Sequence, residues 1–399
     1  MAQLSADGML TLPGVGLTVV AGGWDEDTSR GVARMLAHAR TAADEKIPDA
    51  TGEQPWQAFS DAAGALRAEL VEPRSTPNVH DSTRPSGACT LPLADEVYLE
   101  AGATTQADLE ILAPSVPVEV REQVEQIDPG LDEDVAAWFD DANLRSKLAV
   151  LGPIALRTVR RAKSRPAYWA ELAAYLAYRP HGASADEIAT AFSLTAGSTR
   201  SYLTRLRELL GDDPDKGQPY LPNADESPAK KTRGVNIYKL GALLVDADLF
   251  RRLRLRGQAR GEAGIEDYAT ALRLVTGQPF SQMRDGGGAW FIGGDRIDQH
   301  LTVAIVDVAH LVTTRALAAE DTDTGRAATD IARLAAPDAE GPRLDSAAVD
   351  RAEGRTDEAR RTLLDDVCNR SDDGEPPMEL NPRTKQILAH HRDWLSRAS

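Results

Sequence analysis

The chain has 399 residues, of which 42% are hydrophobic and 27% charged, and its formal net charge at pH 7 is −17. This length suggests two or three domains, and the composition is ordinary for a soluble protein. No run of about 18 apolar residues predicts a membrane span. The N-terminus lacks a signal-peptide pattern and the two cysteines match no metal spacing, so we expect a cytoplasmic protein with no metal or cofactor.

The first 144 residues carry most of the negative charge, with 8 Lys+Arg against 26 Asp+Glu, a balance of −18. Residues 1–72 alternate short apolar runs with helical stretches, such as 31–43 and 57–70, and predict a small α/β domain. Residues 73–144 predict a linker rich in Pro, Ser, Thr and Gly, followed by an acidic helical segment. We expect its acidic side chains to be solvated; the alternative is an internal mimic of DNA charge that weakens DNA binding.

Three helices are predicted between residues 166 and 211. The first has an apolar stripe that begins at Trp169. The second begins with a capping box formed by Ser184 and Glu187, in which each side chain binds a backbone N–H group at the start of the helix. The third is expected to end at Gly211, because glycine suits the C-terminal cap of a helix. Its predicted core stripe consists of Thr199, Leu203, Leu206 and Leu210.

The outward side of the third helix is polar and basic. Short side chains let a helix approach DNA closely, and arginine can bind guanine through two hydrogen bonds. We therefore predict that this helix lies in a DNA major groove. The candidate DNA-binding residues on it are Ser198, Arg200, Ser201, Thr204, Arg205 and Arg207.

Basic residues also gather on both sides of the three helices. Residues 147–157 predict two short strands, after which an exposed loop would present Arg157, Arg160, Arg161, Lys163 and Arg165 to phosphates. Residues 219–222 and 235–240 predict a β-hairpin, a wing whose tip would touch the DNA backbone or the minor groove. The candidate DNA-binding residues of these two regions are Arg160, Arg161, Lys163, Lys230, Lys231 and Arg233.

The net charge of the whole chain conceals this basic module. Residues 145–243 contain 16 Lys+Arg against 9 Asp+Glu, a balance of +7, whereas residues 244–399 contain 21 against 27, a balance of −6. Acidic surroundings repel DNA from the rest of the surface. An acidic chain is therefore compatible with DNA binding through residues 145–243.

Residues 244–399 predict helices nearly to the end of the chain. The exposed side of the first helix is expected to extend the basic surface through Arg251, Arg252, Arg254 and Arg256. Two later stretches match at an offset of 32 residues, for example Ala327 with Ala359. Because a period near 34 is typical of tetratricopeptide-like helical hairpins, we expect an array that binds partners or links subunits.

Nothing in the sequence predicts an enzyme. There is no H-E-x-x-H or G-x-S-x-G motif, and the glycines of residues 12–23 lack the spacing of a phosphate loop. The aromatic residues in the glycine-rich run 278–296 are expected to fill a groove between helices. His390 and His391 are expected to form a surface pair.

The order of these elements resembles the bacterial transcriptional activator domain family, best known from the antibiotic regulatory proteins of actinomycetes. The resemblance covers residues 147 to about 390. It is carried by LAVLGPIAL, by AELAAYLAYRPHGASADEIATAF, by TRLRELLG at 204–211, by VDADLFRRL at 245–253 and by EGRTDEARRTL. It implies a mainly α fold with small β elements, in which a winged helix-turn-helix domain at 145–243 precedes a TPR-like helical domain at 244–399.

The same resemblance implies a transcription factor. Its winged helix would bind direct repeats in promoter DNA, and its helical domain would mediate self-association, as a homodimer, and contact RNA polymerase. Many members carry a tryptophan after the second helix, where this chain has Phe-Ser-Leu at 192–194, and no nucleotide-switch module is present. The layout looks closer to a branch whose N-terminal part is membrane-anchored or binds peptidoglycan. The alternative function is a protein-binding scaffold whose winged helix no longer binds DNA.

Overall fold

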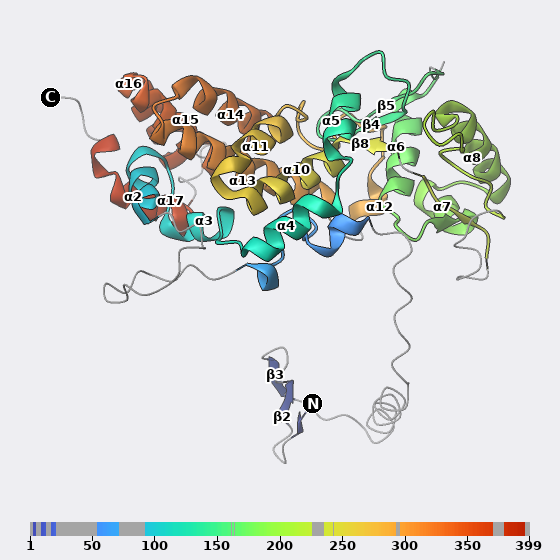
Figure 1. The fold of residues 1–399 in the computed structure, drawn as a ribbon, viewed down its shortest axis with the longest axis horizontal. Helices are drawn as coiled ribbons and strands as arrows, with labels where there is room; N and C mark the ends of the chain where they lie inside the picture. Colours follow the sequence, from blue (N-terminus) through green and yellow to red (C-terminus); the bar gives the residue numbers. More distant parts are fainter. Residues whose placement is uncertain are drawn as a thin grey trace. The chain divides into compact units, whose positions relative to one another are not determined.

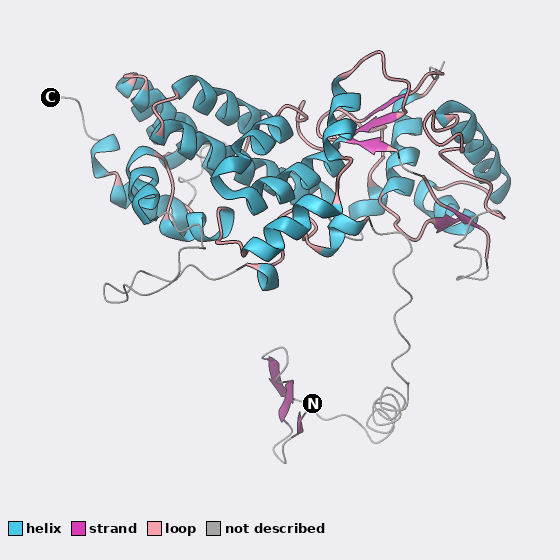
Figure 2. Ribbon diagram, viewed as in Figure 1, coloured by secondary structure: helices cyan, strands magenta, loops and turns pink. Residues whose placement is uncertain are grey.

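The computed structural model of the chain divides into two compact units, Met1–Thr51 and Gly52–Ser399. Most of the described residues belong to the second unit and are helical, with a few short strands (Figure 1, Figure 2). The expectation of a mainly α-helical chain with small β elements is therefore confirmed. The structure describes residues 3–4, 9–12, 17–20, 54–71, 92–160, 162, 164–225, 235–241, 243–292, 296–369 and 379–395.

The first unit contains a three-stranded antiparallel sheet in the order β1-β2-β3. Its strands are β1 (Gln3–Leu4), β2 (Met9–Leu12) and β3 (Leu17–Val20). Strands β2 and β3 form a hairpin in which Met9 lies opposite Val20 and Leu12 lies opposite Leu17. The helix expected at 31–43 and the linker expected from residue 73 lie outside the described residues.

The helices of the second unit form three groups along the chain. The first group is acidic and comprises α2 (Pro92–Ala101), α3 (Gln106–Leu112), α4 (Val118–Ile127) and α5 (Leu131–Phe139). The second comprises α6 (Pro166–Ala177), α7 (Ala185–Phe192) and α8 (Ala196–Leu210). The third comprises α10 (Asp246–Arg260), α11 (Ile265–Leu272), α12 (Ala289–Ile292), α13 (Ile297–Ala318), α14 (Thr322–Ala335), α15 (Glu340–Ala352), α16 (Thr356–Arg361) and α17 (Pro382–His390).

Local sequence signals place the ends of α7 and α8 where they were expected. The predicted capping box is present at the start of α7, where the Ser184 hydroxyl accepts from the N–H of Glu187 and the Glu187 carboxylate accepts from the N–H of Ser184. Helix α8 ends at Gly211, whose φ of +68° favours glycine. All four residues of the predicted core stripe of α8 are buried.

The predicted wing hairpin is wrong among the described residues. Strand β7 (Ile237–Tyr238) pairs with β6 (Ala183–Ser184), which precedes α7, and not with residues 219–222. The turn before β6 depends on Gly182, because a Cβ there would lie 2.5 Å from a methyl carbon of Ile237. Tyr220 is buried instead and anchors the chain after α8, since its N–H donates to the carbonyl of Gly211.

A second small sheet joins the three-helix region to the helices that follow it. Its order is β5-β4-β8, with β5 (Ala155–Arg157) antiparallel and β8 (Leu244–Val245) parallel to β4 (Lys147–Ala149). The predicted pair of strands within 147–157 is therefore confirmed. Residues 276–281 extend this joint, because the N–H of Thr276 donates to the carbonyl of Leu151 and the N–H of Phe280 donates to that of Val150.

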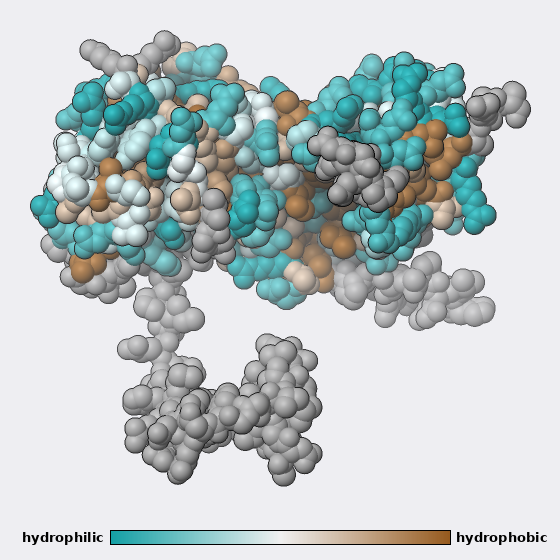
Figure 3. Space-filling view, turned by 180° about the vertical axis from the view of Figure 1, so that it is seen from behind, coloured by the Kyte–Doolittle hydropathy of each residue, from teal (hydrophilic) through white to brown (hydrophobic). Residues whose placement is uncertain are grey.

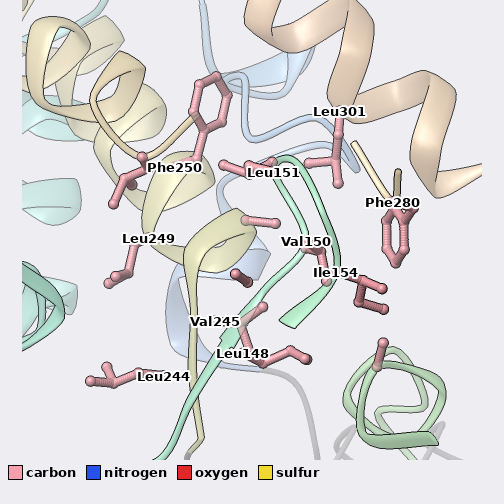
Figure 4. Packing of buried hydrophobic residues seen from close by; sticks show 14 of the residues in the cluster. Leu148, Val150, Leu151, Ile154, Leu244, Val245, Leu249, Phe250, Phe280 and Leu301 are labelled. Atoms are coloured by element: carbon pink, nitrogen blue, oxygen red, sulfur yellow. The ribbon is translucent and has the colours of Figure 1, made fainter. Parts of the chain in front are cut away.

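Asp246, the first residue of α10, joins the start of that helix to the backbone that follows β4. Its buried carboxylate accepts the backbone N–H groups of Val150, Leu151 and Ala247. Figure 4 shows the apolar core around this joint, which includes Leu148, Val150, Leu151, Ile154, Leu244, Val245, Leu249, Phe250, Phe280 and Leu301. No linker residue separates β8 from α10, so the three-helix region and α10 share one core.

The helix predicted at 57–70 is wrong. The structure has 3-10 turns at Pro55–Ala58 and Ala68–Leu70, with a bridge between Ser60 and Leu66. Two features compete with a helix here: the Asp61 carboxylate accepts the N–H groups of Ala63 and Ala65, and Gly64 has φ +82°. The segment packs on α10, because the Leu66 N–H donates to the side chain of Gln258. It belongs to the second unit, whereas we expected a boundary at residue 72.

Helix α13 forms the centre of the third group. By length and composition, it is the one helix among the described residues that could cross a membrane. In the structure, however, 67% of its apolar stretch is buried, and Leu301 and Ile305 are completely covered. Helices α11, α14 and α15 pack on it. A core helix of a soluble protein passes the same length test, so this feature is weak support for a membrane span.

Two of the later helices, α14 and α16, begin 34 residues apart, at Thr322 and Thr356. Buried Gly325 of α14 then corresponds to buried Ala359 of α16. The match expected at 32 is wrong, because Ala327 is exposed whereas Ala359 is buried. A π-helical turn, Thr362–Cys368, follows α16.

Candidate nucleic-acid interface

Helix α8 presents a polar and basic face on the outside of the second unit. Arg200, Ser201, Thr204 and Arg205 are exposed. Ser198 is half-buried, and its hydroxyl accepts a hydrogen bond from the Thr195 hydroxyl at the helix start. The Thr204 hydroxyl donates to the carbonyl of Arg200, so this short side chain lies close to its own helix. Among the residues that the structure describes, the guanidinium groups of Arg200 and Arg205 have no partner, and short side chains separate them.

Arg207 differs from the other predicted residues of α8. Its guanidinium donates from Nε to the carbonyl of Leu221 at 2.7 Å and from NH2 to the carbonyl of Pro222 at 3.2 Å. These bonds tie the segment after α8 to the helix. Contact with DNA would require Arg207 to give up both acceptors, so its position suits a structural role better than the predicted one.

Two described arginines that precede α6, Arg160 and Arg165, contact α8. Arg160 is exposed, and its NH1 group donates to the carbonyl of Glu208 near the end of α8. Arg165 is exposed as well and donates to the hydroxyl of Tyr202. Arg161 and Lys163 of the predicted basic loop lie outside the described residues, as do the predicted wing residues Lys230, Lys231 and Arg233.

The expectation that α10 extends the basic surface is wrong, because its arginines form ion pairs with carboxylates of the same chain. Arg252 binds Asp128 and Asp134, each at 2.7 Å. The other pairs are Arg251 with Asp248, Arg254 with Asp307 at 2.9 Å, Arg256 with Asp132 and with Asp267 at 2.7 Å, and Arg260 with Glu125 at 3.1 Å and with Asp267 at 3.1 Å. A charge count along the sequence cannot distinguish arginines in such ion pairs from a free basic surface.

The acidic segment of α4 and α5 supplies partners for three of these arginines, Arg252, Arg256 and Arg260. Their expected role as a solvated face holds for Glu119, Glu122 and Glu133, which are exposed. It is wrong for Asp128 and Asp134, whose side chains are only 17% and 22% exposed. The acidic segment thus neutralises part of the positive charge of α10, and the outward face of α8 remains exposed within the second unit.

An aromatic cluster that the sequence analysis overlooked supports the inner side of this interface. Tyr202 of α8 lies 4.9 Å from the ring of Tyr168 and 5.5 Å from that of Trp169 on α6. The indole N–H of Trp169 donates to the carbonyl of Ser164, which holds the end of the basic loop. The sequence contained one signal for this cluster, because the aromatic residue Tyr202 directly follows Ser201 of the predicted basic face.

The aromatic residues of the glycine-rich run fill a space between helices, as expected. Phe280 and Phe291 are buried, and the ring of Trp290 lies 5.6 Å from that of Tyr175 on α6. Arg284 from the same run pairs with the buried carboxylate of Glu171 on α6, and the N–H of Gly288 donates to that carboxylate. These contacts fix α6 to the helices that follow the sheet.

The predicted histidine surface pair is wrong for one member. His391 is buried and stacks on Trp394 with ring centroids 4.0 Å apart, and burial lowers the pKa of its imidazole. His390 is exposed. Among the described residues, no group of three His, Cys, Asp or Glu side chains has the arrangement of a metal site.

Apolar side chains on the surface are scattered among several elements. Those more than half exposed are Ile111, Leu144, Val159, Val303 and Leu334. Seen from behind, the described surface is mostly hydrophilic, with apolar areas both near the middle and on the right-hand side of the view (Figure 3).

Comparison with known proteins identifies no relative. No family model matches the chain. No curated protein matches it significantly. No solved structure does so either. The resemblance to a family of transcriptional activators therefore rests on the motifs of the sequence.

Proposed function

We propose that this protein is a sequence-specific DNA-binding transcriptional regulator that places α8 in the major groove. One observation carries the proposal: Arg200, Ser201, Thr204 and Arg205 are all exposed on one side of a helix whose opposite side is buried. The charge of the surrounding module, +7 for residues 145–243, supports the same function. No internal partner covers these side chains within the described part of Gly52–Ser399.

The three helices and the β6-β7 pair support a winged helix-turn-helix arrangement. In this proposal, α8 is the recognition helix. Lys230, Lys231 and Arg233, which lie outside the described residues, would bind the DNA backbone through their charge. Arg200 and Arg205 would bind base edges or line the groove, and Arg160 would bind phosphate. Arg207 would hold the chain after α8 in place.

The helical body that follows has a separate role in the proposal. The 34-residue offset between α14 and α16 favours a tetratricopeptide-like array. Such an array would mediate self-association or contact with RNA polymerase. This assignment implies a cytoplasmic protein.

The test is selection of bound fragments from a random pool of double-stranded DNA by the full chain, followed by affinity measurements at several salt concentrations. Each phosphate contact should add about 0.9 to the slope of log K against log salt. Replacing both Arg200 and Arg205 by alanine should relax sequence preference, because each bidentate contact contributes about 1–3 kcal/mol of base discrimination. Lys230→Ala with Lys231→Ala should weaken binding to all sequences.

Absence of salt-dependent DNA retention would overturn this function. The remaining function would then be a scaffold in which the α8 face binds a protein. A matched control is Arg333→Ala, which removes an exposed arginine from α14 and should leave DNA affinity unchanged.

A further inference from the structure

Arg165 occupies a backbone conformation that arginine rarely adopts. It is the residue before Pro166 at the start of α6, and its φ and ψ are +54° and +50°, in the left-handed region that favours glycine. The only other non-glycine residue of the three-helix region in this conformation, among those that the structure describes, is Ser193. Strained backbone positions are concentrated at functional sites, so the conformation of Arg165 directs attention to its side chain.

The guanidinium of Arg165 is held in place by α8. Its NH1 group donates to the hydroxyl of Tyr202 at 3.0 Å, although both side chains are at the surface. Tyr202 cannot swing away freely, because its ring packs between Tyr168 and Trp169 of α6. The backbone next to Arg165 is fixed as well, since the carbonyl of Ser164 accepts from the Trp169 indole.

This arrangement places a positive charge beside the proposed recognition face. On a helix, residues three and four positions apart are neighbours, so Tyr202 lies on the same flank of α8 as Ser198 and Arg205. Among the residues that the structure describes, no ion pair links Arg165 to a carboxylate, in contrast to the arginines of α10. Its remaining N–H donors can therefore serve an external anion.

We propose that Tyr202 positions the guanidinium of Arg165 as a phosphate-binding group at the edge of the α8 interface. This inference rests on the proposed DNA-binding function. It singles out Arg165 among the arginines predicted to face phosphates and adds Tyr202 as the residue that positions it. The guanidinium suits a backbone phosphate, because its planar fork can donate two hydrogen bonds to phosphate oxygens. Preorganisation by Tyr202 reduces the side-chain entropy that the contact would otherwise lose.

The left-handed backbone gives a clean test. Glycine and asparagine adopt this conformation more readily than arginine does, so Arg165→Gly and Arg165→Asn should unfold no more easily than the wild type. In the full chain, both should bind a selected DNA fragment more weakly. The slope of log K against log salt should become less steep by about 0.9, the effect of one lost phosphate contact.

Tyr202→Phe tests the positioning role. It keeps the ring and the charge of Arg165 but removes the hydroxyl, so it should weaken binding in the wild type and have no effect when Arg165 is already glycine. Arg333→Ala is the control that should change neither quantity.

Unchanged affinity and salt slope in both Arg165 variants would overturn the proposal while leaving DNA binding by α8 intact. An equal loss from Tyr202→Phe in both backgrounds would refute the positioning role. If the wild type itself shows no salt-dependent binding, the proposed function fails and this inference fails with it.

Discussion

The buried side chain of Asp246 should make the stability of the protein depend on pH. Its carboxylate accepts three backbone N–H groups where the sheet meets α10, an arrangement that favours the charged form. Burial has the opposite and larger effect, and raises the pKa of Asp246 to about 7. A carboxyl group in the unfolded chain has a pKa near 3.8. The folded protein should therefore bind one more proton at this site than the unfolded chain does between about pH 4 and pH 7.

This difference predicts a pH dependence of stability. As the pH rises from about 4 to 7, the free energy of unfolding of the wild type should fall relative to that of Asp246→Asn, by up to about 1.4 kcal/mol per pH unit. Above pH 7 the difference should be constant. Urea denaturation of both proteins across this range measures it, with the exposed Asp330→Asn as control. A difference that does not vary with pH would mean that the three N–H groups offset the effect of burial.

The pair of Glu171 and Arg284 is a second case at the residue scale. Glu171 is completely buried, and one of its oxygens lies 2.7 Å from the Arg284 guanidinium. Arg284→Ala would leave this carboxylate with the Gly288 N–H as a partner, and should lower the free energy of unfolding by about 3 kcal/mol or more. The change is measured by urea denaturation.

A matched control exists for this prediction. Arg296 and Asp298 are also 2.7 Å apart, but their side chains are 40% and 21% exposed, so Arg296→Ala should have a smaller effect. The double variant Glu171→Gln with Arg284→Ala should lose less than Arg284→Ala alone, since no charge then remains buried. Equal losses from Arg284→Ala and Arg296→Ala would contradict the burial argument.

At the scale of elements, the three-helix region does not end where its sequence pattern ends. Its sheet includes β8, and the backbone of residues 150–152 is bound by Asp246 and by residues 276–281. A fragment that stops at residue 243 loses β8 and exposes several N–H and C=O groups that are buried in the full chain.

We therefore expect the fragment 145–243 to lack a cooperative thermal transition. Circular dichroism of the fragment and of the full chain compares them directly, with the full chain showing a sharp transition. A fragment that melts cooperatively near the midpoint of the full chain would show that the joint contributes little to folding.

Local signals explain which elements could be predicted from the sequence. The capping box of Ser184 and Glu187, the cap at Gly211 and the core stripe of α8 all act within a few residues, and each was confirmed. The wing hairpin failed because the partner of β7 is β6, which lies more than 50 residues earlier in the chain. The basic surface expected on α10 failed for the same reason, because its acidic partners Asp128 and Asp134 lie more than 100 residues away.

The candidate site was predictable to a similar extent. Exposure of Arg200, Ser201, Thr204 and Arg205 followed from helical periodicity, which is a local property. The bonds of Arg207 to the carbonyls of Leu221 and Pro222 did not, because they depend on how the chain turns after α8. The left-handed conformation of Arg165 has no signal in the residue type, since arginine is not a residue that favours it.

For the whole molecule, the distribution of charge matters more than its sum. The net charge of −17 conceals arginines of α10 that are neutralised inside the second unit and arginines of α8 that remain exposed. Repulsion between DNA and the acidic remainder would then favour contact through α8, and would be reduced at high salt.

The division into two compact units predicts how the chain tolerates truncation. Removing residues 1–51 should leave the midpoint of thermal unfolding of residues 52–399 unchanged, because the described core clusters consist of residues from 52 onward. Calorimetry of the truncated and full chains tests this. A lower midpoint after truncation would show that the first unit stabilises the second.

The direct passage of β8 into α10 has a mechanical consequence. The three-helix region and the helices that follow β8 share a sheet and a core, so they cannot rotate independently of each other. The position in which α8 binds would therefore fix the direction of the helices from α10 onward. Two copies bound next to each other on DNA would place these helices on the same side of the duplex only if their binding sites are separated by multiples of about 10 base pairs. Inserting half a helical turn of DNA between the two binding sites would place the helices of the two copies on opposite sides of the duplex.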